Sequence, residues 1–310
     1  MESVHCNLCG ADNYTEYLTR GDLNLFTKGT FRLVRCLECG LVYLNPRPSA
    51  KEIQSYYLDD YDQYSVAVRD EKSTLVRLAR RYGLRKRIRA ILHYKSKGRL
   101  LDVGCATGDF LAEMHKVRGW DVYGVEPSPV ASQYARQHLG VSVRTGLFDE
   151  VGFTEGSFDV ITMWNVLEHL SDPFHSLSTI NRLLASNGLL VVSTPILDSL
   201  DARMFGPYWI GYEIPRHLYI FSTETLKAMF RRAGFKIIAS QCLYGGYAAS
   251  ASSFRFWLRA RALGACWRET LENVLFAYPL RFLFAPYFFV RDRWFHACSI
   301  PSFFALKVAS

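Results

Sequence analysis

The clearest chemical pattern of the sequence lies between residues 100 and 126. Residues 100–110 read LLDVGCATGDF, which is an apolar run, an acid and a glycine-rich turn that opens an amphipathic helix. Gly104 and Gly108 permit a tight turn and a close approach of a ligand to the backbone. Glu126 ends the next apolar run, 22 residues after Gly104, where the acid of a βαβ unit binds a ribose diol. The pattern therefore predicts a site for a nucleotide-like ligand.

A second pattern is a set of four cysteines near the start of the chain. Cys6 and Cys9 form CNLCG, and Cys36 and Cys39 form CLECG. Two C-x-x-C pairs suit tetrahedral Zn²⁺, and the glycine after each pair permits a tight knuckle around the ion. Because cysteines fill all four positions, we predict a structural zinc in a ribbon of strands, with no open position for catalysis.

The elements that must position the nucleotide-like site alternate regularly after Glu126. Strand-like apolar segments alternate with helical patterns, and this alternation predicts a parallel, doubly wound α/β sheet. The strand-like segments are 141–144, 158–163 and 189–193, and the helical patterns are 130–138 and 174–184. Ligands of such sheets bind at the carboxyl ends of the strands. We therefore expect residues 102–108, 126, 146–148 and 164–169 to converge on one site.

These residues resemble the class I S-adenosylmethionine-dependent methyltransferases. The resemblance rests on DVGCATG, VEP, SFDVITMWNVLEHLSDP and RLLASNGLLVVSTP, in that order, and it covers roughly residues 97–245. It implies a seven-stranded methyltransferase sheet with an antiparallel last strand. Residues 235–242 and 302–309 are predicted as the sixth and seventh strands, separated by about 55 residues in place of the usual short hairpin.

The resemblance also assigns residues to S-adenosyl-L-methionine. It places the methionine end on the glycine-rich turn, the ribose at the acid of VEP, and the adenine beside TGLF. The implied residues are Asp102, Gly104, Cys105, Ala106, Gly108, Glu126, Pro127, Leu147, Phe148, Trp164 and Asn165. Many relatives carry an acid for the adenine amino group where this chain has TGLF, so we expect apolar and backbone contacts to adenine.

His169 is the best-placed candidate for a catalytic base. It follows the predicted fourth strand, and histidine ordinarily titrates near neutral pH. The chain is similar here to sugar C-methyltransferases, which implies that His169 is the base and that Glu168 assists it. A purely structural role of His169 in shaping the loop is the alternative.

A polar cluster in an aromatic stretch, residues 209–226, predicts a lid over the acceptor. Glu213, Arg216, His217 and Tyr219 are its candidate substrate residues. Arg216 could equally cap backbone carbonyls.

Charge is unevenly placed along the chain. The net charge is +8, whereas residues 69–99 alone carry 12 Lys or Arg against two acids. We predict that this segment forms a basic helix. Its basic face is solvated, or it attracts a phosphate-bearing acceptor, an anionic membrane surface or RNA.

The stretch that precedes this helix, CGLVYLNPRPSAKEIQSYY, resembles the zinc-ribbon prefix of methyltransferases in sugar, polysaccharide and small-molecule biosynthesis.

Four segments result from these patterns. We predict a zinc ribbon (1–46), a basic helical linker (47–96), a core that binds S-adenosylmethionine (97–245 with 300–310) and an aromatic helical insertion (246–299). The insertion is either a packed cap or a hairpin on a membrane surface. No apolar leader and no uncharged run of about 20 residues is present. The expected location is cytoplasmic, with peripheral contact at the inner face of a membrane as a second option.

The expected function is methyl transfer from S-adenosylmethionine to a small-molecule or lipid-linked biosynthetic acceptor, most plausibly a sugar or polysaccharide precursor. The alternatives are an RNA methyltransferase and a non-catalytic methyltransferase-like binding protein. A nucleic acid is less favoured because the basic helix lacks interleaved aromatic residues for base stacking. The sequence predicts no oligomeric state.

Overall fold

The structure is a computed structural model, and it describes residues 1–57, 67–148, 150–261, 265–294 and 297–308. The other residues, among them parts of the predicted segments 47–96, 246–299 and 300–310, lie outside the described residues. The chain forms two compact units. The first unit comprises Met1–Leu58, Thr194–Ala228 and Tyr244–Pro301, and the second comprises Asp59–Ser193, Met229–Leu243 and Ser302–Ser310. The division into four segments remains a prediction.

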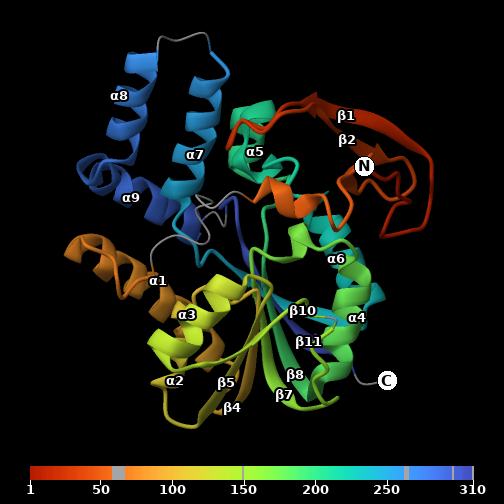
Figure 1. Cartoon of the computed structure of the whole chain (residues 1–310), viewed down its shortest axis with the longest axis vertical. Helices are drawn as coiled ribbons and strands as arrows, with labels where there is room; N and C mark the ends of the chain where they lie inside the picture. Colours follow the sequence, from red (N-terminus) through yellow and green to blue (C-terminus); the bar gives the residue numbers. More distant parts are fainter. Residues whose placement is uncertain (58–66, 149, 262–264, 295–296, 309–310) are drawn as a thin grey trace. The chain divides into compact units, whose positions relative to one another are not determined.

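The second unit is built on a seven-stranded sheet in the order β10-β11-β8-β7-β4-β5-β6 (Figure 1). Neighbouring strands from β8 to β6 are parallel, whereas β11 runs antiparallel to both β8 and β10. The strands are β4 (Gly98–Val103), β5 (Trp120–Glu126), β6 (Ser142–Thr145), β7 (Phe158–Trp164), β8 (Leu184–Ser193), β10 (Phe235–Gln241) and β11 (Ser302–Lys307). The predicted fold class, with an antiparallel last strand, is confirmed.

Helices cover both faces of this sheet. Figure 1 shows α2 and α3 on one side of the sheet and α4 on the other. The helices are α1 (Thr74–Leu92), α2 (Asp109–His115), α3 (Pro129–Leu139) and α4 (Pro173–Leu183). The side chain of Ser128 caps α3 and that of Asp172 caps α4, because each accepts a hydrogen bond from an amide of the first turn. The helical patterns at 130–138 and 174–184 thus predicted real helices.

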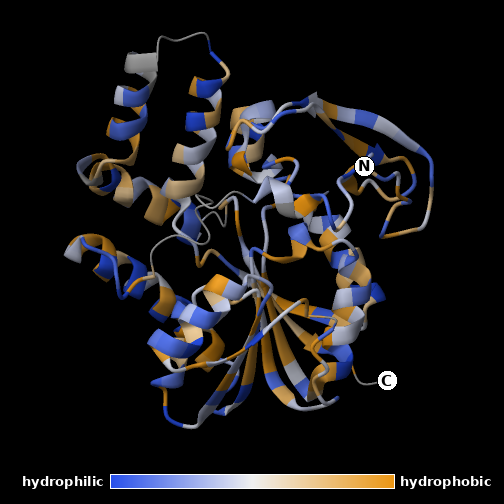
Figure 2. Ribbon diagram, viewed as in Figure 1, coloured by the Kyte–Doolittle hydropathy of each residue, from blue (hydrophilic) through white to orange (hydrophobic). Residues whose placement is uncertain are grey.

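The core of the second unit follows from the alternation of side chains along the strands. Leu100, Val122 and Val160 pack into the cluster that also holds the apolar faces of α1 to α3. Their neighbours Leu101 and Ile161 are also fully buried. The strands are therefore covered on both faces, as parallel strands require, and Figure 2 shows them as largely apolar.

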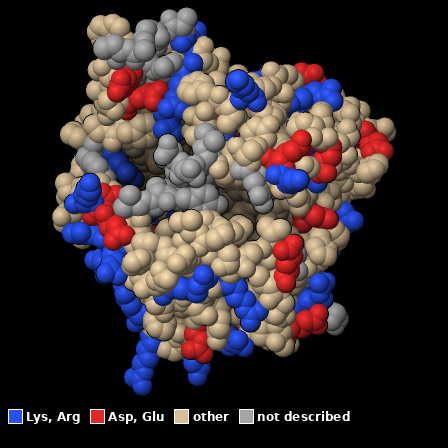
Figure 3. Space-filling view, viewed as in Figure 1, with Lys and Arg blue, Asp and Glu red and all other residues tan. Residues whose placement is uncertain are grey.

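Helix α1 is the predicted basic helix. Ile88 and Ile91 in its second half pack into the core cluster. Leu75, Leu78 and Tyr82 in its first half are exposed. Figure 3 shows Lys and Arg side chains over α1 at the left edge of the view. The basic face of this helix is therefore solvated, and only its carboxyl-terminal half is fixed by packing.

The first unit contains an antiparallel sheet in the order β1-β2-β3-β9. The strands β1 (Tyr14–Arg20), β2 (Phe31–Cys36) and β3 (Val42–Leu44) form the predicted ribbon, and β9 (Tyr219–Ile220) joins it from far along the chain. Only two pairs hold β9, Val42 with Ile220 and Tyr43 with Tyr219. A two-residue strand carries no periodicity, so the sequence could not reveal this pairing.

The rest of the first unit is mainly helical. Its helices are α5 (Leu200–Phe205), α7 (Gly246–Arg259), α8 (Ala265–Phe276) and α9 (Tyr278–Trp294), and α6 (Thr223–Arg232) follows β9. Ser222 caps the start of α6, because its hydroxyl accepts a hydrogen bond from the Thr225 amide (3.2 Å). The predicted insertion is therefore helical in its described residues.

Among the described residues, no single helix has both the length and the hydropathy to cross a membrane. One bent pair, Glu269–Phe276 with Pro279–Trp294, meets that test only when its two parts are taken together.

Candidate active site and metal centre

The segments predicted to bind one ligand follow neighbouring strands of the second unit. Val103, at the end of β4, pairs with Val125 of β5 and with Met163 of β7. These three strands therefore end at the same level, and β6 lies beside β5. The loops after the four strands emerge at one edge of the sheet, as predicted.

The glycine-rich turn after β4 admits no side chain at two positions. Gly104 has φ 69°, and a Cβ there would lie 2.7 Å from Cγ2 of Val166. Gly108 has φ 81°, and a Cβ there would lie 2.9 Å from Cβ of Ala135. Left-handed backbone and tight packing thus both require glycine. The turn keeps its backbone open for close approach by a ligand.

Cys105 and Ala106 complete this turn. Cys105 is buried, and burial raises the pKa of its thiol, which therefore stays neutral. Ala106 has φ 47° and directs its amide toward Glu126. Both residues therefore shape the backbone of the turn.

Glu126 ties the ends of β4 and β5 together. Its carboxylate accepts hydrogen bonds from the Ala106 amide (2.8 Å) and the Ser128 amide (2.9 Å), one on each oxygen. The residue is 3% exposed, and this burial raises the pKa of its carboxyl. A carboxylate has about four acceptor positions. Glu126 therefore keeps acceptor capacity for a diol, while its neighbour Pro127 is exposed.

Asp102 ends β4 as a second buried acid. Burial raises its pKa to about 7, although a hydrogen bond from the Thr162 hydroxyl (2.6 Å) and the charge of Arg87 act in the opposite direction. The nearby Glu126 adds to the increase. Thr162 was not among the predicted site residues, although a threonine in the apolar run of β7 was a visible signal.

Trp164 is the last residue of β7, and Asn165 follows it. The Trp164 ring makes an edge contact with Phe110 (5.2 Å between centroids), and the Arg87 guanidinium lies over it. Asn165 adopts φ 58°, which turns the chain at the strand end. Among the described residues, the buried Trp164 Nε1 and Asn165 Oδ1 have no hydrogen-bond partner. Buried polar atoms without partners at this edge suit a polar ligand.

Leu147 and Phe148 follow β6. Phe148 is buried, whereas Leu147 is exposed. The turn at Gly146 is held by a hydrogen bond from its amide to the carbonyl of Glu126 (3.1 Å). These apolar side chains therefore stand next to the strand end that carries Glu126, and adenine contact remains a prediction for them.

Glu168 and His169 form a short helical turn, Leu167–His169, after β7. Glu168 is buried and His169 is partly buried. The His169 amide donates to the carbonyl of Val166 (3.0 Å), which fixes the backbone of the turn. Their catalytic role remains a prediction.

Arg216 of the first unit is fully buried in a network of acids. Its guanidinium binds both oxygens of Asp22 (2.9 Å each) and Oε1 of Glu213 (3.1 Å), and it donates to the carbonyl of Tyr56 (3.3 Å). Burial alone raises the pKa of Asp22, but the hydrogen bonds and charge of Arg216 outweigh it and hold the pKa below its ordinary value. Asp22 lies 194 residues from Arg216 and belongs to no recognisable motif, so this pair was not predictable from the sequence.

The other predicted lid residues surround Arg216. His217 contacts the carbonyl of Gly211 through Nδ1 (2.8 Å), and its Nε2 lies 3.8 Å from Glu213. Burial lowers the pKa of His217, although Glu213 opposes this effect. The hydroxyl of Tyr219 accepts a hydrogen bond from Arg47 (3.0 Å). Glu213, Arg216 and His217 thus belong to one network, whereas Tyr219 is bound to Arg47, and contact of these residues with substrate remains a prediction.

Replacing Asp22 with asparagine should lower the free energy of unfolding of the first unit by about 2 kcal/mol near neutral pH, because buried Arg216 loses one of its two counter-charges and keeps only Glu213. The pKa of Asp22 is lowered in the folded state, so its stabilisation is present above the unfolded value of roughly 3.9 and fades as pH falls below it. Denaturant unfolding of both proteins across this range measures the difference. The exposed Asp12→Asn variant is the control, and equal stability of Asp22→Asn and wild type at neutral pH would contradict the prediction.

The four predicted metal ligands meet in the first unit. The Sγ atoms of Cys6, Cys9, Cys36 and Cys39 all lie within 4.8 Å of one another. Cys6 and Cys39 are 3.4 Å apart, and Cys9 and Cys36 are 3.5 Å apart. Zn–S bonds of about 2.3 Å in a tetrahedron place the sulfurs about 3.8 Å apart. The donor set and its spacing therefore fit Zn²⁺.

Two similar backbone knuckles present these thiols. The Gly10 amide donates to the carbonyl of Cys6 (2.7 Å), and the Gly40 amide donates to that of Cys36 (3.0 Å). Both glycines have positive φ, 81° and 76°, which closes the turn. The exposed His5 pairs with Asp12, so it is a bystander to the cluster.

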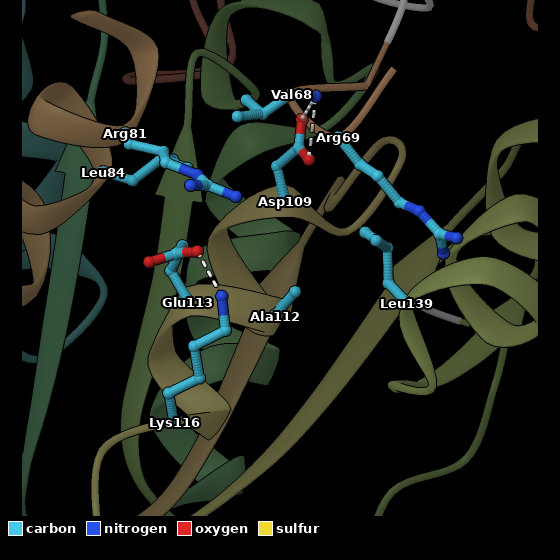
Figure 4. A pocket seen from close by; sticks show the side chains of 9 residues that line it. All are labelled: Val68, Arg69, Arg81, Leu84, Asp109, Ala112, Glu113, Lys116 and Leu139. Carbon is cyan, nitrogen blue, oxygen red and sulfur yellow. Dashed lines mark hydrogen bonds and ion pairs between the residues drawn. The ribbon is translucent and has the colours of Figure 1, made fainter. Parts of the chain in front are cut away.

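A pocket of about 140 Å³ opens elsewhere on the second unit (Figure 4). Figure 4 shows Asp109 and Glu113 of α2 with Arg81 of α1 in its wall, and both oxygens of Asp109 accept from the Val68 amide. The volume is below the roughly 300 Å³ of small-molecule sites. The pocket therefore belongs to the packing between α1 and α2.

Comparisons with known proteins agree with this architecture. The family model described as "Methyltransferase domain" matches residues 76–240. A ubiquinone biosynthesis O-methyltransferase of Cereibacter sphaeroides is 31% identical over 147 residues, which are 44% of this chain and 59% of that protein. The mitochondrial ubiquinone biosynthesis O-methyltransferase of Schizosaccharomyces pombe is 36% identical over 113 residues, 34% of this chain and 40% of that protein. The matched region thus spans 59% of the first relative and 40% of the second, less than two thirds of either protein.

Solved structures share the fold at lower identity. The [4+2]-cyclase SpnF has a TM-score of 0.54 and 18% identity, with 85% of this chain and 98% of that chain covered. A putative sarcosine dimethylglycine methyltransferase from Galdieria sulphuraria has a TM-score of 0.51 and 13% identity, with 79% and 92% covered. One fold thus carries proteins named for different reactions, and the site must decide the function.

Proposed function

The chain belongs to the S-adenosylmethionine-dependent methyltransferase family, and from this premise we propose that it transfers a methyl group to a hydroxyl oxygen of a small or lipid-linked biosynthetic acceptor. The observation that carries the proposal is the hydrogen-bonded contact between the Glu126 carboxylate and the glycine-rich turn. Glu126 is buried, is held by two backbone amides, and keeps acceptor capacity at an edge where Gly104 leaves no side chain. A ribose diol is the group that such a carboxylate binds.

The residues present fit S-adenosylmethionine, which supplies an activated methyl group when bound. Glu126 would hold the ribose hydroxyls, and the turn from Gly104 to Gly108 would accommodate the methionine portion. Trp164 and Asn165 carry buried polar atoms without partners among the described residues, and these atoms would complete the contacts. Leu147 and Phe148 would flank the adenine.

The protein's own contribution to the reaction is mainly positioning. An in-line displacement on an activated methyl needs an aligned nucleophile, and alignment supplies much of the rate. A hydroxyl must also lose its proton when it forms the new bond. We assign this proton to His169, with Glu168 beside it in sequence on the same turn after β7.

Two kinds of acceptor share the required chemistry. The curated relatives are named for O-methyl transfer in ubiquinone biosynthesis, which supports an oxygen nucleophile. The likeness of residues 39–57 to a biosynthetic zinc-ribbon prefix supports a sugar or polysaccharide precursor. A hydroxyl group is the nucleophile that both kinds of acceptor offer. The proposed location of the protein is the cytoplasm.

The proposal is tested with S-adenosylmethionine that carries a labelled methyl group. A catechol, a nucleoside-diphosphate sugar and total RNA serve as separate acceptors. We expect label on a hydroxyl oxygen of one of the small acceptors, with release of S-adenosylhomocysteine. Label found only in RNA would replace the proposal with RNA methylation, and tight binding without any turnover would indicate a binding protein.

Replacing His169 with asparagine should lower kcat about 100-fold, because general-base catalysis of this kind contributes at least that factor. The affinity for S-adenosylmethionine should change little, and the pH dependence of kcat should lose its acid limb, because a general base stops working when it is protonated. His175→Asn, at an exposed position of α4, is the matched control. A His169→Asn enzyme with the wild-type kcat and pH profile would leave His169 a structural residue.

A further inference from the structure

Helices α8 and α9 are anchored within the first unit at their carboxyl-terminal ends, which form the base of the pair. Arg291, near the end of α9, is buried and donates to Asp201 (2.8 Å), and Ser299 donates to the same carboxylate (2.6 Å). The hydroxyl of Tyr247 on α7 donates to the carbonyl of Leu275 at the end of α8 (2.5 Å). These contacts fix the two helices to the body of their unit.

Beyond this base, α9 exposes large apolar side chains to solvent. Phe282 is 65% exposed, Leu283 71% and Phe289 65%. Other large apolar side chains that are exposed on the two helices are Trp267, Leu271, Val274, Phe276, Phe284, Tyr287, Val290 and Trp294. Figure 2 shows apolar positions along α9. A contiguous exposed apolar surface of this kind indicates an interaction site.

The exposed apolar arc of α9 is wide. Phe282, Leu283 and Phe284 are consecutive and all exposed. At about 100° per residue these three side chains alone span about 200° of the helix circumference. A helix that packs on one protein partner needs an apolar stripe little wider than about 100°. An arc that exceeds half of the circumference fits a surrounding medium better than a second protein surface.

The charges of α9 favour an anionic medium, because its basic residues Arg281, Arg291 and Arg293 outnumber its single acid Asp292, which is bound to Arg291. Helix α8 carries the acids Glu269 and Glu272, of which Glu272 is bound to Arg259 of α7. Between Asn273 and Val290 the only charged residue is Arg281, which is exposed, and no acid is present. Arg293 is exposed at the end of α9, next to Trp294. Arginine and tryptophan at the edge of an apolar surface suit the phosphate level of a bilayer.

We propose that α8 and α9 form a docking surface for an anionic lipid bilayer, with α9 immersed at the boundary between head groups and acyl chains. Glu269–Phe276 and Pro279–Trp294 meet at a bend of 57°, so they form one bent helical segment. Arg281 and Arg293 contact lipid phosphates there. The docking surface is independent of the proposed methyl transfer, since lipid binding needs neither cofactor nor turnover.

Flotation of the full chain with vesicles tests this surface. We expect the protein to float with vesicles of equal parts phosphatidylglycerol and phosphatidylcholine, and less with phosphatidylcholine alone. The triple variant Phe282→Ser, Leu283→Ser and Phe289→Ser should lose at least about tenfold in vesicle affinity, because three exposed apolar side chains no longer enter the membrane. All three positions are exposed, so the fold should not depend on them.

The control variant removes three exposed apolar side chains from a different basic helix. Leu75→Ser, Leu78→Ser and Tyr82→Ser on α1 should leave vesicle binding unchanged. An equal loss in both triple variants, or no vesicle binding by the wild type, overturns the proposal. So does a lipid-free dimer that the α9 variant converts to a monomer, since the apolar arc would then cover a second copy.

Tryptophan quenching locates the contact. Trp267 and Trp294 are 72% and 75% exposed, and bromine-labelled acyl chains in the same anionic vesicles should quench their fluorescence. The double variant Trp267→Phe and Trp294→Phe should lose most of this quenching while it still floats. Quenching that persists in the double variant would place the membrane contact elsewhere and overturn the assignment to α8 and α9.

Discussion

A Cys36→Ser protein should lose its zinc and the folded ribbon at residues 1–44. Cys36 is one of four thiols that lie within 4.8 Å of one another, and serine is a poor ligand for Zn²⁺. Structural zinc contributes roughly 10 kcal/mol or more to the folding of small modules. The sheet around it is short, with only three residues in β3 and two in β9. We therefore expect the largest stability loss of any single substitution here.

Elemental analysis checks this expectation. The wild type should contain about one zinc per chain, and the Cys36→Ser protein much less, with early proteolysis of the ribbon. His5→Ala is the matched control, because His5 lies beside the first pair yet is bound to Asp12. A metal-free wild type with an intact ribbon would contradict the prediction of a structural zinc. Zinc loss in His5→Ala would indicate that His5 is a ligand.

Glu126→Ala should weaken the binding of S-adenosylmethionine about 100-fold or more. Two hydrogen bonds that ribose hydroxyls donate to a charged carboxylate contribute about 1.5–3 kcal/mol each, and 1.4 kcal/mol corresponds to a factor of ten. The substitution also removes the acceptor for the amides of Ala106 and Ser128, so the turn loses part of its support. Titration calorimetry measures the affinity without any knowledge of the acceptor.

Two comparisons sharpen this measurement. Glu113→Ala, which removes a carboxylate that pairs with Lys116 on the same unit, should bind as the wild type does. Burial raises the pKa of Glu126, so the wild-type affinity should fall at mildly acid pH as the carboxylate takes up its proton. The site assignment fails if Glu126→Ala binds with unchanged affinity.

The fold was predictable because its signals are local. The apolar runs at 158–163 and 189–193 became β7 and β8, and the acid of VEP became the buried Glu126 at the end of β5. Strand and helix periodicity and turn glycines act over a few residues, so they are legible without a structure. The spacing of the two cysteine pairs was equally legible, because tetrahedral coordination demands it.

The surroundings of the predicted lid were not predictable. Arg216 was identified, but its partner Asp22 lies 194 residues away and belongs to no motif. The pairing of β9 with β3 has the same character, because two residues carry no period. Contacts between segments that are distant in sequence depend on the tertiary packing of the chain, so no local sequence pattern predicts them.

By itself the sequence determined the sheet, the glycine-rich turn with Glu126, and the four-cysteine cluster. Each depends on backbone geometry or ligand chemistry that is written into neighbouring residues. Only the tertiary structure decided that Arg216 is buried and ion-paired with Asp22 and Glu213, and that the apolar side chains of α9 are exposed. The burial of a side chain depends on what packs against it. The sequence of an apolar run is the same whether a protein core or a membrane covers it.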